Sequence, residues 1–444
     1  MVASGPERAI HENVPAPAAD ATLDVWLAWL EAGRGEHIDL GLERCREVAA
    51  RLDLGRPAPV VVTVAGTNGK GSSVALLEAI WRSAGYRVGA YTSPHLLRYN
   101  ERIRIAGEAL ADRPICHAFA AVEAARADVP LTYFEFATLA ALTIFASAAL
   151  DVVILEVGLG GRLDAVNIVD ADVALIAAIG LDHEDWLGTT REQIAAEKAG
   201  IMRHGRPAVC SDQAVPEALI AHATVCGAVL ALLGVDFGFE VTEDAWTWWA
   251  GSTIREALPP PALDGTHQYR NAAGALAVVE LLQTRLPVGD DALRHGLQGV
   301  VLHGRFDCVH DTYEYVMDVA HNPQAAEIFT ATLTARPAAG RTHALIGMLR
   351  TKNHLEFLRP LIPLVDRWHF ADLPGSNGAR AVDLAATLAR LAPRARPSCH
   401  GTVVQAHAAL LEGAAPGDRI LVLGSFLTVG AMMRIFNAKR HAAG

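Results

Sequence analysis

The sequence predicts an α/β protein: a P-loop-type ATPase domain with a mainly parallel sheet, followed by a smaller Rossmann-like α/β domain. Three observations support this fold class. Short apolar, β-branched runs alternate with helical patterns in both halves of the chain, as in parallel sheets that helices cover on both faces. A glycine-rich loop containing a lysine follows the first run. The chain has 444 residues, which is more than one core usually accommodates.

We place the ATPase domain at residues 21–298, after a frayed tail of residues 1–20. Its expected strands lie, in order, at 59–66, 87–93, 151–158, 172–180 and 206–210. A helical pattern at 72–85, closed by a glycine, follows the first of them. The apolar stretch 131–150 is expected to be a buried helix of the domain and not a membrane span, because Glu135 lies within it and a strand pattern follows directly.

The remaining segments complete this plan. In residues 227–264 apolar and polar residues alternate and a turn follows, which indicates a small antiparallel insertion. A helix is expected at 267–284. The second domain, residues 299–444, repeats the α/β alternation. Its expected strands lie at 313–321, 341–349, 365–373 and 418–426, with helical runs between them.

Composition narrows the class of partner. Hydrophobic residues make up 51% of the chain, which excludes a disordered protein. The net charge of −11 argues against nucleic acid, since phosphate backbones require a basic face. The six cysteines form no C-x-x-C pair, and the N-terminal segment has no apolar signal core. We therefore expect a cytoplasmic protein with reduced thiols, no membrane partner and small-molecule ligands, acting as a monomer.

The glycine-rich loop GTNGKGS, residues 66–72, lies between the first strand and the first helix of this domain. It departs from the pattern G-x-x-x-x-G-K-[ST], because Val64 stands at the first glycine position and Gly71 separates Lys70 from Ser72. Backbone N–H groups of residues 67–71 and the helix N-terminus suit a phosphate chain. Lys70 would neutralise phosphate oxygens, and Ser72 or Ser73 would reach Mg²⁺. The alternative is a tight glycine turn, which has little use for a lysine between two glycines.

Polar residues follow three of the expected strands. Ser93 ends the second, Glu156 ends the third, and Asp182, His183, Glu184 and Asp185 follow the fourth. The carboxyl ends of parallel strands form the ligand crevice of an open sheet. A hydroxyl, a carboxylate and an imidazole beside an ATP loop therefore indicate a Mg²⁺ site. Each of these residues alone would more often be an ordinary surface or core group.

Together these segments resemble the folate branch of the Mur ligase superfamily, the folylpolyglutamate synthase/dihydrofolate synthase family. The resemblance runs from about residue 38 to residue 427. It is carried by GTNGKGS, YTSPHL, ILEVGLGGRLDAVN, LDHEDWLG, EKAGI, HGRF and DVAHNP. In this family the extra glycine after the lysine is the normal form of the loop.

The resemblance implies an ATP-dependent amide ligase. Such an enzyme adds L-glutamate to dihydropteroate through an acyl phosphate and later extends tetrahydrofolate to polyglutamates. The implied cofactors are ATP and a pair of Mg²⁺ ions, with a monovalent cation such as K⁺ in addition. The implied metal residues are Ser93, Glu156, His183 and Lys198, and the implied catalytic residues are Lys70, Lys198, His183 and Arg305.

The resemblance also implies where nucleotide and acceptor bind. The nucleotide residues are Thr67, Asn68, Gly69, Lys70, Gly71, Ser72, Asn271, Arg305 and Asp318. The acceptor residues are Asp39, Leu40, Gly41, Leu42, Thr132, Tyr133, Phe134, Glu135, Leu163, Asp164, Ala165 and His321. Phe134 and Asp164 offer a flat pterin aromatic contact and a hydrogen-bond acceptor.

Two implied residues have ordinary alternatives. Lys198 lies in a helix expected to begin near Thr190, and alone it would be read as a solvated helix lysine. In the family this lysine is carried as a carbamate, which would supply an anionic metal ligand. Arg305 lies at the expected domain junction, where the alternative is a hinge salt bridge. His321 and Ser425 are candidates for contacting glutamate.

One motif departs from the family. The family often has D-K-D after a G-M-L strand, whereas this chain has Thr351-Lys352-Asn353. Two other functions remain open at this stage: a folylpolyglutamate synthase without the dihydropteroate activity, and a regulatory P-loop ATPase that binds a protein partner.

Overall fold

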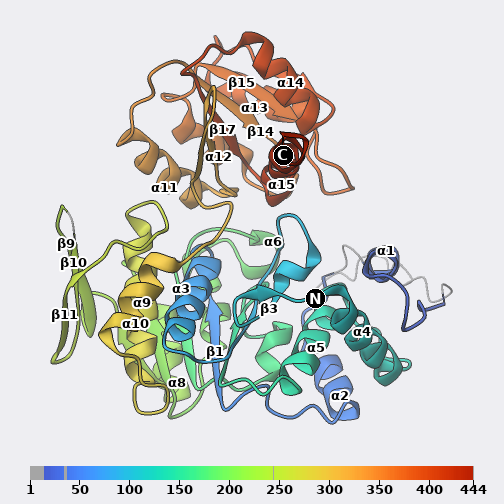
Figure 1. The fold of residues 1–444 in the computed structure, drawn as a ribbon, viewed down its shortest axis with the longest axis vertical. Coiled ribbons are helices and arrows are strands. Elements are labelled where there is room, and N and C mark those ends of the chain that lie inside the picture. Colours follow the sequence, from blue (N-terminus) through green and yellow to red (C-terminus); the bar gives the residue numbers. More distant parts are fainter. Residues whose placement is uncertain (1–14, 35–37, 244, 444) are drawn as a thin grey trace.

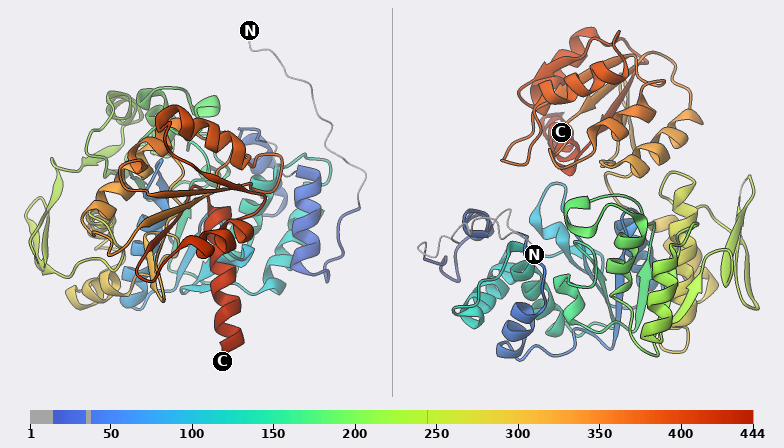
Figure 2. Two further views of the ribbon diagram at one scale, coloured as in Figure 1. Left: turned by 90° about the horizontal axis from the view of Figure 1, so that it is seen from above. Right: turned by 180° about the vertical axis from the view of Figure 1, so that it is seen from behind.

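The computed structural model describes residues 15–34, 38–243 and 245–443. Its strands form three sheets of eight, three and six strands. The first two sheets come from the part of the chain before residue 260, and the third comes from the part after residue 306. Figures 1 and 2 show the six-stranded sheet and its helices stacked above the larger α/β layer. The predicted tail, residues 1–20, lies mostly outside the described residues.

The eight-stranded sheet has the order β4-β3-β2-β5-β1-β6-β7-β8. From β2 to β8 every pairing is parallel, and β3 and β4 are antiparallel additions at one edge. The strands are β1 (Val60–Ala65), β2 (Val88–Tyr91), β3 (Ile103–Ile105), β4 (Glu108–Ala109), β5 (Val152–Glu156), β6 (Val173–Ile176), β7 (Pro207–Cys210) and β8 (Val229–Leu232).

Helices cover both faces of this sheet. One face carries α1 (Leu23–Arg34), α2 (Glu43–Arg51), α4 (Asp112–Arg126), α5 (Tyr133–Ala146), α7 (Arg191–Ala199) and α8 (Glu217–Cys226). The other carries α3 (Lys70–Ser83), α9 (His267–Leu281) and α10 (Asp290–Gly299). Along β1, Val61 faces the first group while Val60 and Val62 face the second, because successive side chains of a strand alternate. Burial on both faces explains why the sequence of β1 is continuously apolar.

The three-stranded sheet is the predicted antiparallel insertion. It consists of β9 (Phe237–Val241), β10 (Trp246–Ala250) and β11 (Thr253–Leu258) in the order β11-β10-β9. The buried Trp248 of β10 donates its indole N–H to the carbonyl of Ala273 in α9, 3.1 Å away. The predicted range was too wide, however, because β8 at its start pairs with β7 in the large sheet. In the large sheet, the short strands β3, β4 and β8 were not predicted.

The six-stranded sheet has the order β12-β13-β17-β14-β15-β16, and only β12 is antiparallel to its neighbour. Its strands are β12 (Asp307–His310), β13 (Glu314–Met317), β14 (Thr342–Ile346), β15 (Arg367–Ala371), β16 (Ser398–His400) and β17 (Arg419–Leu423). Its helices are α11 (Pro323–Thr334), α12 (His354–Leu358), α13 (Ala381–Leu391), α14 (Val403–Gly413) and α15 (Phe426–Ala443). Each face of the sheet has its own apolar core.

This architecture confirms the predicted α/β fold class, with a large mainly parallel sheet followed by a second α/β sheet. Among the described residues, no helix has both the length and the apolar character needed to cross a bilayer. The stretch 131–150 forms α5, which is almost entirely buried within the first layer.

Candidate functional site

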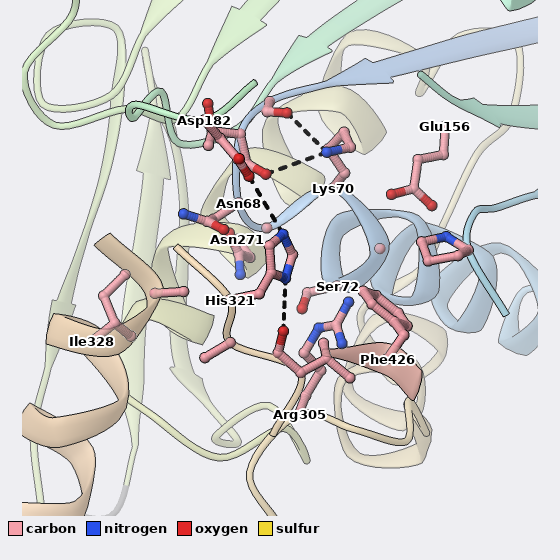
Figure 3. Close-up of a pocket in the computed structure, with 18 of the residues that line it drawn as sticks. Asn68, Lys70, Ser72, Glu156, Asp182, Asn271, Arg305, His321, Ile328 and Phe426 are labelled. Atoms are coloured by element: carbon pink, nitrogen blue, oxygen red, sulfur yellow. Dashed lines mark hydrogen bonds and ion pairs between the residues drawn. The ribbon is translucent and has the colours of Figure 1, made fainter. Parts of the chain in front are cut away.

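A cavity of about 200 Å³ lies at the carboxyl ends of β1, β5 and β6 and is closed from the other side by residues of the later sheet. Figure 3 shows Lys70, Glu156, Arg305 and His321, which come from four separate segments, around the same space. All of the predicted nucleotide and metal residues line this cavity: Thr67, Asn68, Gly69, Lys70, Gly71, Ser72, Ser93, Glu156, His183, Lys198, Asn271, Arg305 and Asp318.

The glycine-rich loop joins β1 to α3, which begins at Lys70. Gly69 has a φ of 86°, and a Cβ there would lie 2.5 Å from Oδ1 of Asn271. Both the backbone conformation and the close approach of Asn271 therefore require glycine at this position. The loop places the N-terminus of α3 toward the cavity, where its unpaired N–H groups and dipole favour an anion.

The Lys70 side chain folds back over its own loop. Its ammonium donates to the carbonyls of Gly66 and Thr67, at 2.9 and 3.3 Å. Burial lowers the pKa of Lys70, while the carboxylates of Glu156 and Asp182 act in the opposite direction. A buried cation at the helix N-terminus is suited to neutralise a phosphate chain.

Three groups of the predicted metal set surround the base of the cavity. Glu156, at the end of β5, is buried, and its Oε2 accepts from the backbone N–H of Ser93 at 3.2 Å. Burial raises the pKa of Glu156, and Lys70 opposes this shift. Burial also lowers the pKa of His183 to about 4, so its imidazole is neutral at pH 7, which is the form that binds metals.

This donor set fits a hard cation that is also held by substrate oxygens. Within the described part of the chain, no three His, Cys, Asp or Glu side chains are grouped closely enough to hold a metal. Carboxylate and hydroxyl oxygens with an imidazole are nevertheless ligands of the right chemistry, and Mg²⁺ commonly completes its shell with phosphate and water. Lys198 is buried at the same site, and burial lowers its pKa to about 7.

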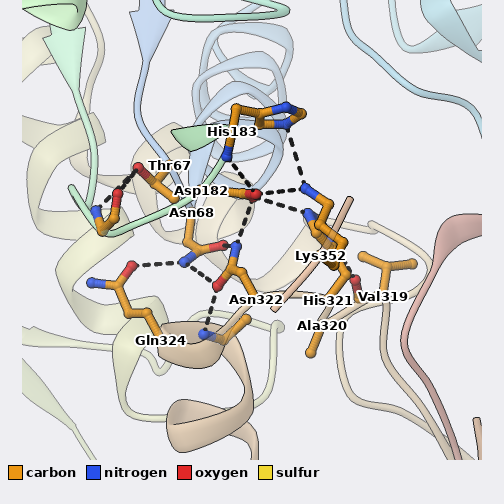
Figure 4. Close-up of polar contacts among 12 residues, drawn as sticks. Thr67, Asn68, Asp182, His183, Val319, Ala320, His321, Asn322, Gln324 and Lys352 are labelled. Atoms are coloured by element: carbon orange, nitrogen blue, oxygen red, sulfur yellow. Dashed lines mark hydrogen bonds and ion pairs between the residues drawn. The ribbon is translucent and has the colours of Figure 1, made fainter. Parts of the chain in front are cut away.

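Asp182 connects the two halves of the chain (Figure 4). Its Oδ1 accepts from the Lys352 ammonium at 2.6 Å, and its Oδ2 lies 3.2 Å from Nδ2 of Asn322 and 3.4 Å from Nε2 of His321. Despite its burial, the contact with His321 and the charge of Lys352 hold the pKa of Asp182 well below its usual range. Lys352 also lies 3.4 Å from Nε2 of His183, so the lysine retained in the Thr351-Lys352-Asn353 motif is directed at the site.

The glycine-rich loop itself is held by the later half of the chain. Asn68 and Asn322 exchange amide hydrogen bonds of 3.1 and 3.0 Å, and Asn68 also donates to Oε1 of Gln324 at 2.6 Å. Asn322 is almost fully buried and caps α11 by accepting from the N–H of Ala325. Figure 4 shows these amides meeting beside Thr67 and Asp182.

Arg305 enters the cavity from the segment before β12, and Asp318 enters it from the end of β13. The Arg305 guanidinium lies over the ring of Phe426, 5.4 Å from its centroid. Asp318 accepts from the backbone N–H groups of Phe306 and Ala320, at 2.9 and 2.7 Å. Burial raises the pKa of Asp318 to about 6, with Arg305 acting in the opposite direction. Both side chains thus line the cavity opposite the glycine-rich loop of the first half.

The predicted acceptor residues, apart from His321, do not line this cavity. They form a neighbouring cluster that Arg44 connects: its guanidinium contacts Asp39 at 2.6 Å and the buried Glu135 at 2.9 Å. Leu42 stands at the start of α2, and Thr132 caps α5 together with Glu135. The structure therefore brings residues 39–42 and 132–135 together.

Aromatic and acidic groups complete that cluster. Phe134 packs against Tyr91, with ring centroids 6.1 Å apart, and a Cβ on Gly158 would lie 2.5 Å from the Phe134 ring. The Arg102 guanidinium lies 5.7 Å from the centroid of the Tyr133 ring.

Residues 163–165 connect this cluster to the loop after β5. Asp164 is buried, and its two oxygens accept from the N–H groups of Leu159 and Val166. Burial raises the pKa of Asp164 to about 6. Ala165 begins the short 3₁₀ helix that follows, and Leu163 directly precedes Asp164. The Asp164 oxygens are therefore already engaged by the backbone, which sequence reasoning did not foresee.

The sequence did not identify Arg44, Asn322 and Gln324 as polar residues of this region. It also gave no indication that Lys352 pairs with Asp182. Asn322 was within the quoted motif DVAHNP, so the motif contained a signal for it. Arg44 and Gln324 lie in helical segments with nothing local that distinguishes them.

Comparison with models of protein families identifies the class of protein to which this chain belongs. The model of the Mur ligase middle domain matches residues 64–225, and that of the Mur ligase glutamate ligase domain matches residues 304–426. The cavity described above lies between these two regions, so fold and site define a Mur-type ATP-dependent ligase.

Full-length relatives give the family. The dihydrofolate synthase/folylpolyglutamate synthase of Escherichia coli is 45% identical over 424 residues, covering 96% of this chain and 98% of the relative. A structure of E. coli FolC with DHPP and ADP superposes with a TM-score of 0.89 and covers 96% of this chain and 100% of the other. A bifunctional folylpolyglutamate synthase/dihydrofolate synthase with Mn, AMPPNP and L-glutamate has a TM-score of 0.87, 45% identity and coverages of 95% and 100%. This chain belongs to the dihydrofolate synthase/folylpolyglutamate synthase family, whose members are ATP-dependent ligases of folate metabolism.

Proposed function

We propose that this chain adds L-glutamate to dihydropteroate, giving dihydrofolate, and extends tetrahydrofolate to its polyglutamates. The observation that carries the proposal is the single cavity in which the glycine-rich loop, the strand-end residues Glu156 and His183, and Arg305 of the later half meet. Relatives that are 45% identical along almost the whole chain carry both activities in their names, which supports the same pair here.

The proposed reaction has two steps. ATP phosphorylates the acceptor carboxylate to an acyl phosphate, and the amine of L-glutamate then attacks the carbonyl carbon and releases phosphate. Lys70 and the N–H groups of residues 67–71 hold the phosphates, and Arg305 approaches from the other half to stabilise charge in the transition state. Asn271 contacts the adenine and Asp318 the ribose. No covalent intermediate with an enzyme side chain is needed.

A pair of Mg²⁺ ions is assigned to Ser93, Glu156, His183 and Lys198 carried as a carbamate. Bound Mg²⁺ would neutralise phosphate charge during transfer. Relatives crystallised with Mn and a nucleotide analogue support a divalent ion at such a site. A monovalent cation such as K⁺ is a further cofactor in this proposal.

The acceptor is assigned to the cluster joined by Arg44. Residues 39–42, 132–135 and 163–165 would enclose dihydropteroate, with Phe134 against the pterin ring. The close contacts of Phe134 with Tyr91 and Gly158 hold that ring in place. His321 lies across the nucleotide cavity, beside Asp182, and is assigned to the incoming glutamate.

The same proposal covers the organisation of the protein. We divide the chain into an ATP- and pterin-binding domain, residues 21–298, and a C-terminal domain, residues 299–444. The change from the second to the third sheet between β11 and β12 supports this boundary. The protein is proposed to act as a monomer in the cytoplasm.

The test is substrate dependence. Purified protein should release phosphate from ATP only when Mg²⁺, an acceptor and L-glutamate are all present, and mass spectrometry should detect dihydrofolate when the acceptor is dihydropteroate. Phosphate release with tetrahydrofolate but never with dihydropteroate would reduce the protein to a folylpolyglutamate synthase. Release without either acceptor would contradict the ligase proposal.

A further inference from the structure

A second cavity, of about 340 Å³, adjoins the reaction centre beside α3 and reaches Gly71 at the end of the glycine-rich loop. The two cavities share Gly71, Ser93, Pro94, Glu156, Arg305 and Phe426. Its remaining walls come from one face of α3, from β3 and the turn that follows it, and from residues 299–303. None of the residues assigned to the acceptor lines it. We call it the side cavity.

The inner part of the side cavity contains a carboxylate with spare hydrogen-bonding capacity. Glu78 of α3 is only 5% exposed. Its Oε2 accepts from Arg104 at 2.9 and 2.8 Å, but its Oε1 has no hydrogen-bond partner within the described residues. An unpaired buried oxygen costs stability, so a ligand with an N–H group would satisfy it.

The outer part is basic and open. Arg82, one helical turn after Glu78, is exposed and lies directly against Gly107 in the turn between β3 and β4. Val301, on the opposite wall, is 72% exposed. The side cavity is thus lined by the buried Glu156, by the unpaired acceptor oxygen of Glu78 and by the exposed guanidinium of Arg82.

We propose that the side cavity binds the terminal γ-glutamyl unit of the acceptor during chain extension. This proposal rests on the proposed function. In a folate acceptor, the reactive γ-carboxyl group is attached to a unit that carries one amide N–H and one α-carboxylate. With the γ-carboxyl group at Ser93 and Glu156, the amide N–H binds Oε1 of Glu78 and the α-carboxylate binds the guanidinium of Arg82.

Chain length supplies the physical reason for a separate cavity. Every added glutamate increases the distance between the pterin and the reactive carboxyl group, so a site that fixes the pterin serves one length only. A cavity that binds the last unit and opens to solvent serves every length. Dihydropteroate has neither an α-carboxylate nor this amide, and so it makes no use of Glu78 or Arg82.

The test compares two reactions of the same enzyme. Glu78→Gln keeps the shape and an oxygen for Arg104 but places an N–H₂ group where Oε1 accepts, and Arg82→Gln removes the surface charge. Each should raise the KM for tetrahydrofolate about tenfold or more, as loss of a hydrogen bond to a charged group does. The KM for dihydropteroate should stay within about twofold. Arg87→Gln, a nearby exposed arginine outside the side cavity, is the matched control.

This inference would be overturned if the variants lost both reactions equally or changed neither. It would also be overturned if the wild-type enzyme could not extend tetrahydrofolate. A wild-type enzyme with neither reaction would refute the proposed function itself, and the inference with it. If Glu78→Gln does not fold, the exposed Arg82→Gln decides alone. Mass spectrometry of the products should also show shorter polyglutamates with both variants.

Discussion

The ammonium group of Lys352 lies 2.6 Å from Oδ1 of Asp182, and both side chains are nearly buried, at 7% and 10% exposure. Asp182 precedes α6 (Glu184–Leu187) in the first half of the chain, whereas Lys352 follows β14 in the second. One ion pair therefore links the strand end that carries His183 to the opposing sheet. The arrangement of the two halves and the geometry at His183 depend on each other through this contact.

Lys352→Met should destabilise the protein markedly, because it leaves the Asp182 carboxylate buried without its cation. Breaking a buried pair in this way typically costs about 3–5 kcal/mol. The control is Arg359→Met, which breaks the exposed pair with Glu356 and should change stability far less, because solvent screens exposed pairs. Thermal unfolding of both variants checks this. Equal shifts in the unfolding midpoint would mean that solvent already screens the Lys352–Asp182 pair.

Asn322→Ser tests the amide pair with Asn68. Serine can still cap α11, but it cannot reach Asn68 of the glycine-rich loop, so the loop loses this connection to the second half. We expect the KM for ATP to rise about tenfold, with a smaller change in the KM for dihydropteroate. Asn353→Ser makes the same change at the cap of α12, where Asn353 accepts from the N–H of Glu356, and should leave ATP use unchanged. Equal effects of the two variants would count against the coupling.

The sequence predicted the parts of the site that local pattern determines. The strand, loop and helix around Lys70 are contiguous, and Glu156 and His183 each follow a strand, so topology alone brings them to one edge. The contacts of Arg44, Lys352 and Gln324 depend on how segments separated by 91 to 256 residues pack. No local periodicity encodes such pairings.

The strands missed from the sequence share a physical reason. β4, of two residues, is an edge strand of the large sheet, and β3, of three residues, lies next to it with a partly exposed face. β8, at the other edge of the large sheet, is half-exposed as well. β12 and β16, which were also missed, are the two edges of the six-stranded sheet. Edge strands bury little apolar surface, so their sequences lack the continuous apolar run by which β1 and β5 were predicted.

Arg44→Met should affect acceptor use selectively. Arg44 holds Asp39 to Glu135, and thereby places residues 39–42 beside the start of α5. We expect the KM for dihydropteroate to rise about tenfold while the KM for ATP stays within about twofold. Arg51→Met, on the same helix and paired with the exposed Glu47, is the control. A parallel rise in both KM values would show that Arg44 supports the fold and not the acceptor site.

His369 should contribute stability that is lost as the pH decreases from about 6.5 to about 4. Burial lowers the pKa of His369 to about 4, and the neighbouring imidazoles of His343 and His400, stacked on either side, lower it further. The unfolded value is about 6.5, so the unfolded chain binds more protons between these pH values and the free energy of unfolding decreases on acidification. His369→Gln should reduce the slope of the unfolding free energy against pH by the equivalent of up to about one bound proton. His117→Gln, at an exposed position of α4, should leave that slope unchanged. Urea unfolding at several pH values measures the slope.

Lys198 has the environment that carbamate formation requires. It is 3% exposed, and burial, reinforced by the charge of Lys70, lowers its pKa to about 7. Carbon dioxide adds only to the neutral amine, which is far more abundant at neutral pH here than in an ordinary lysine with a pKa near 10.4. The neutral fraction increases as the pH rises through 7, so carbamate formation should increase in the same direction.

Ligation should therefore depend on carbon dioxide. Enzyme degassed at pH 6 should lose activity and regain it with bicarbonate at pH 8, and ¹³C NMR with labelled bicarbonate should show a carbamate signal that Lys198→Ala lacks. The alanine variant should bind ATP at Lys70 but not ligate, because the hard cations would lose an anionic oxygen ligand. Short carboxylic acids should partly restore its activity by occupying the space that the side chain leaves. Full activity without carbon dioxide, together with no labelled signal, would establish that Lys198 acts as a plain amine, and its buried position would then serve packing alone.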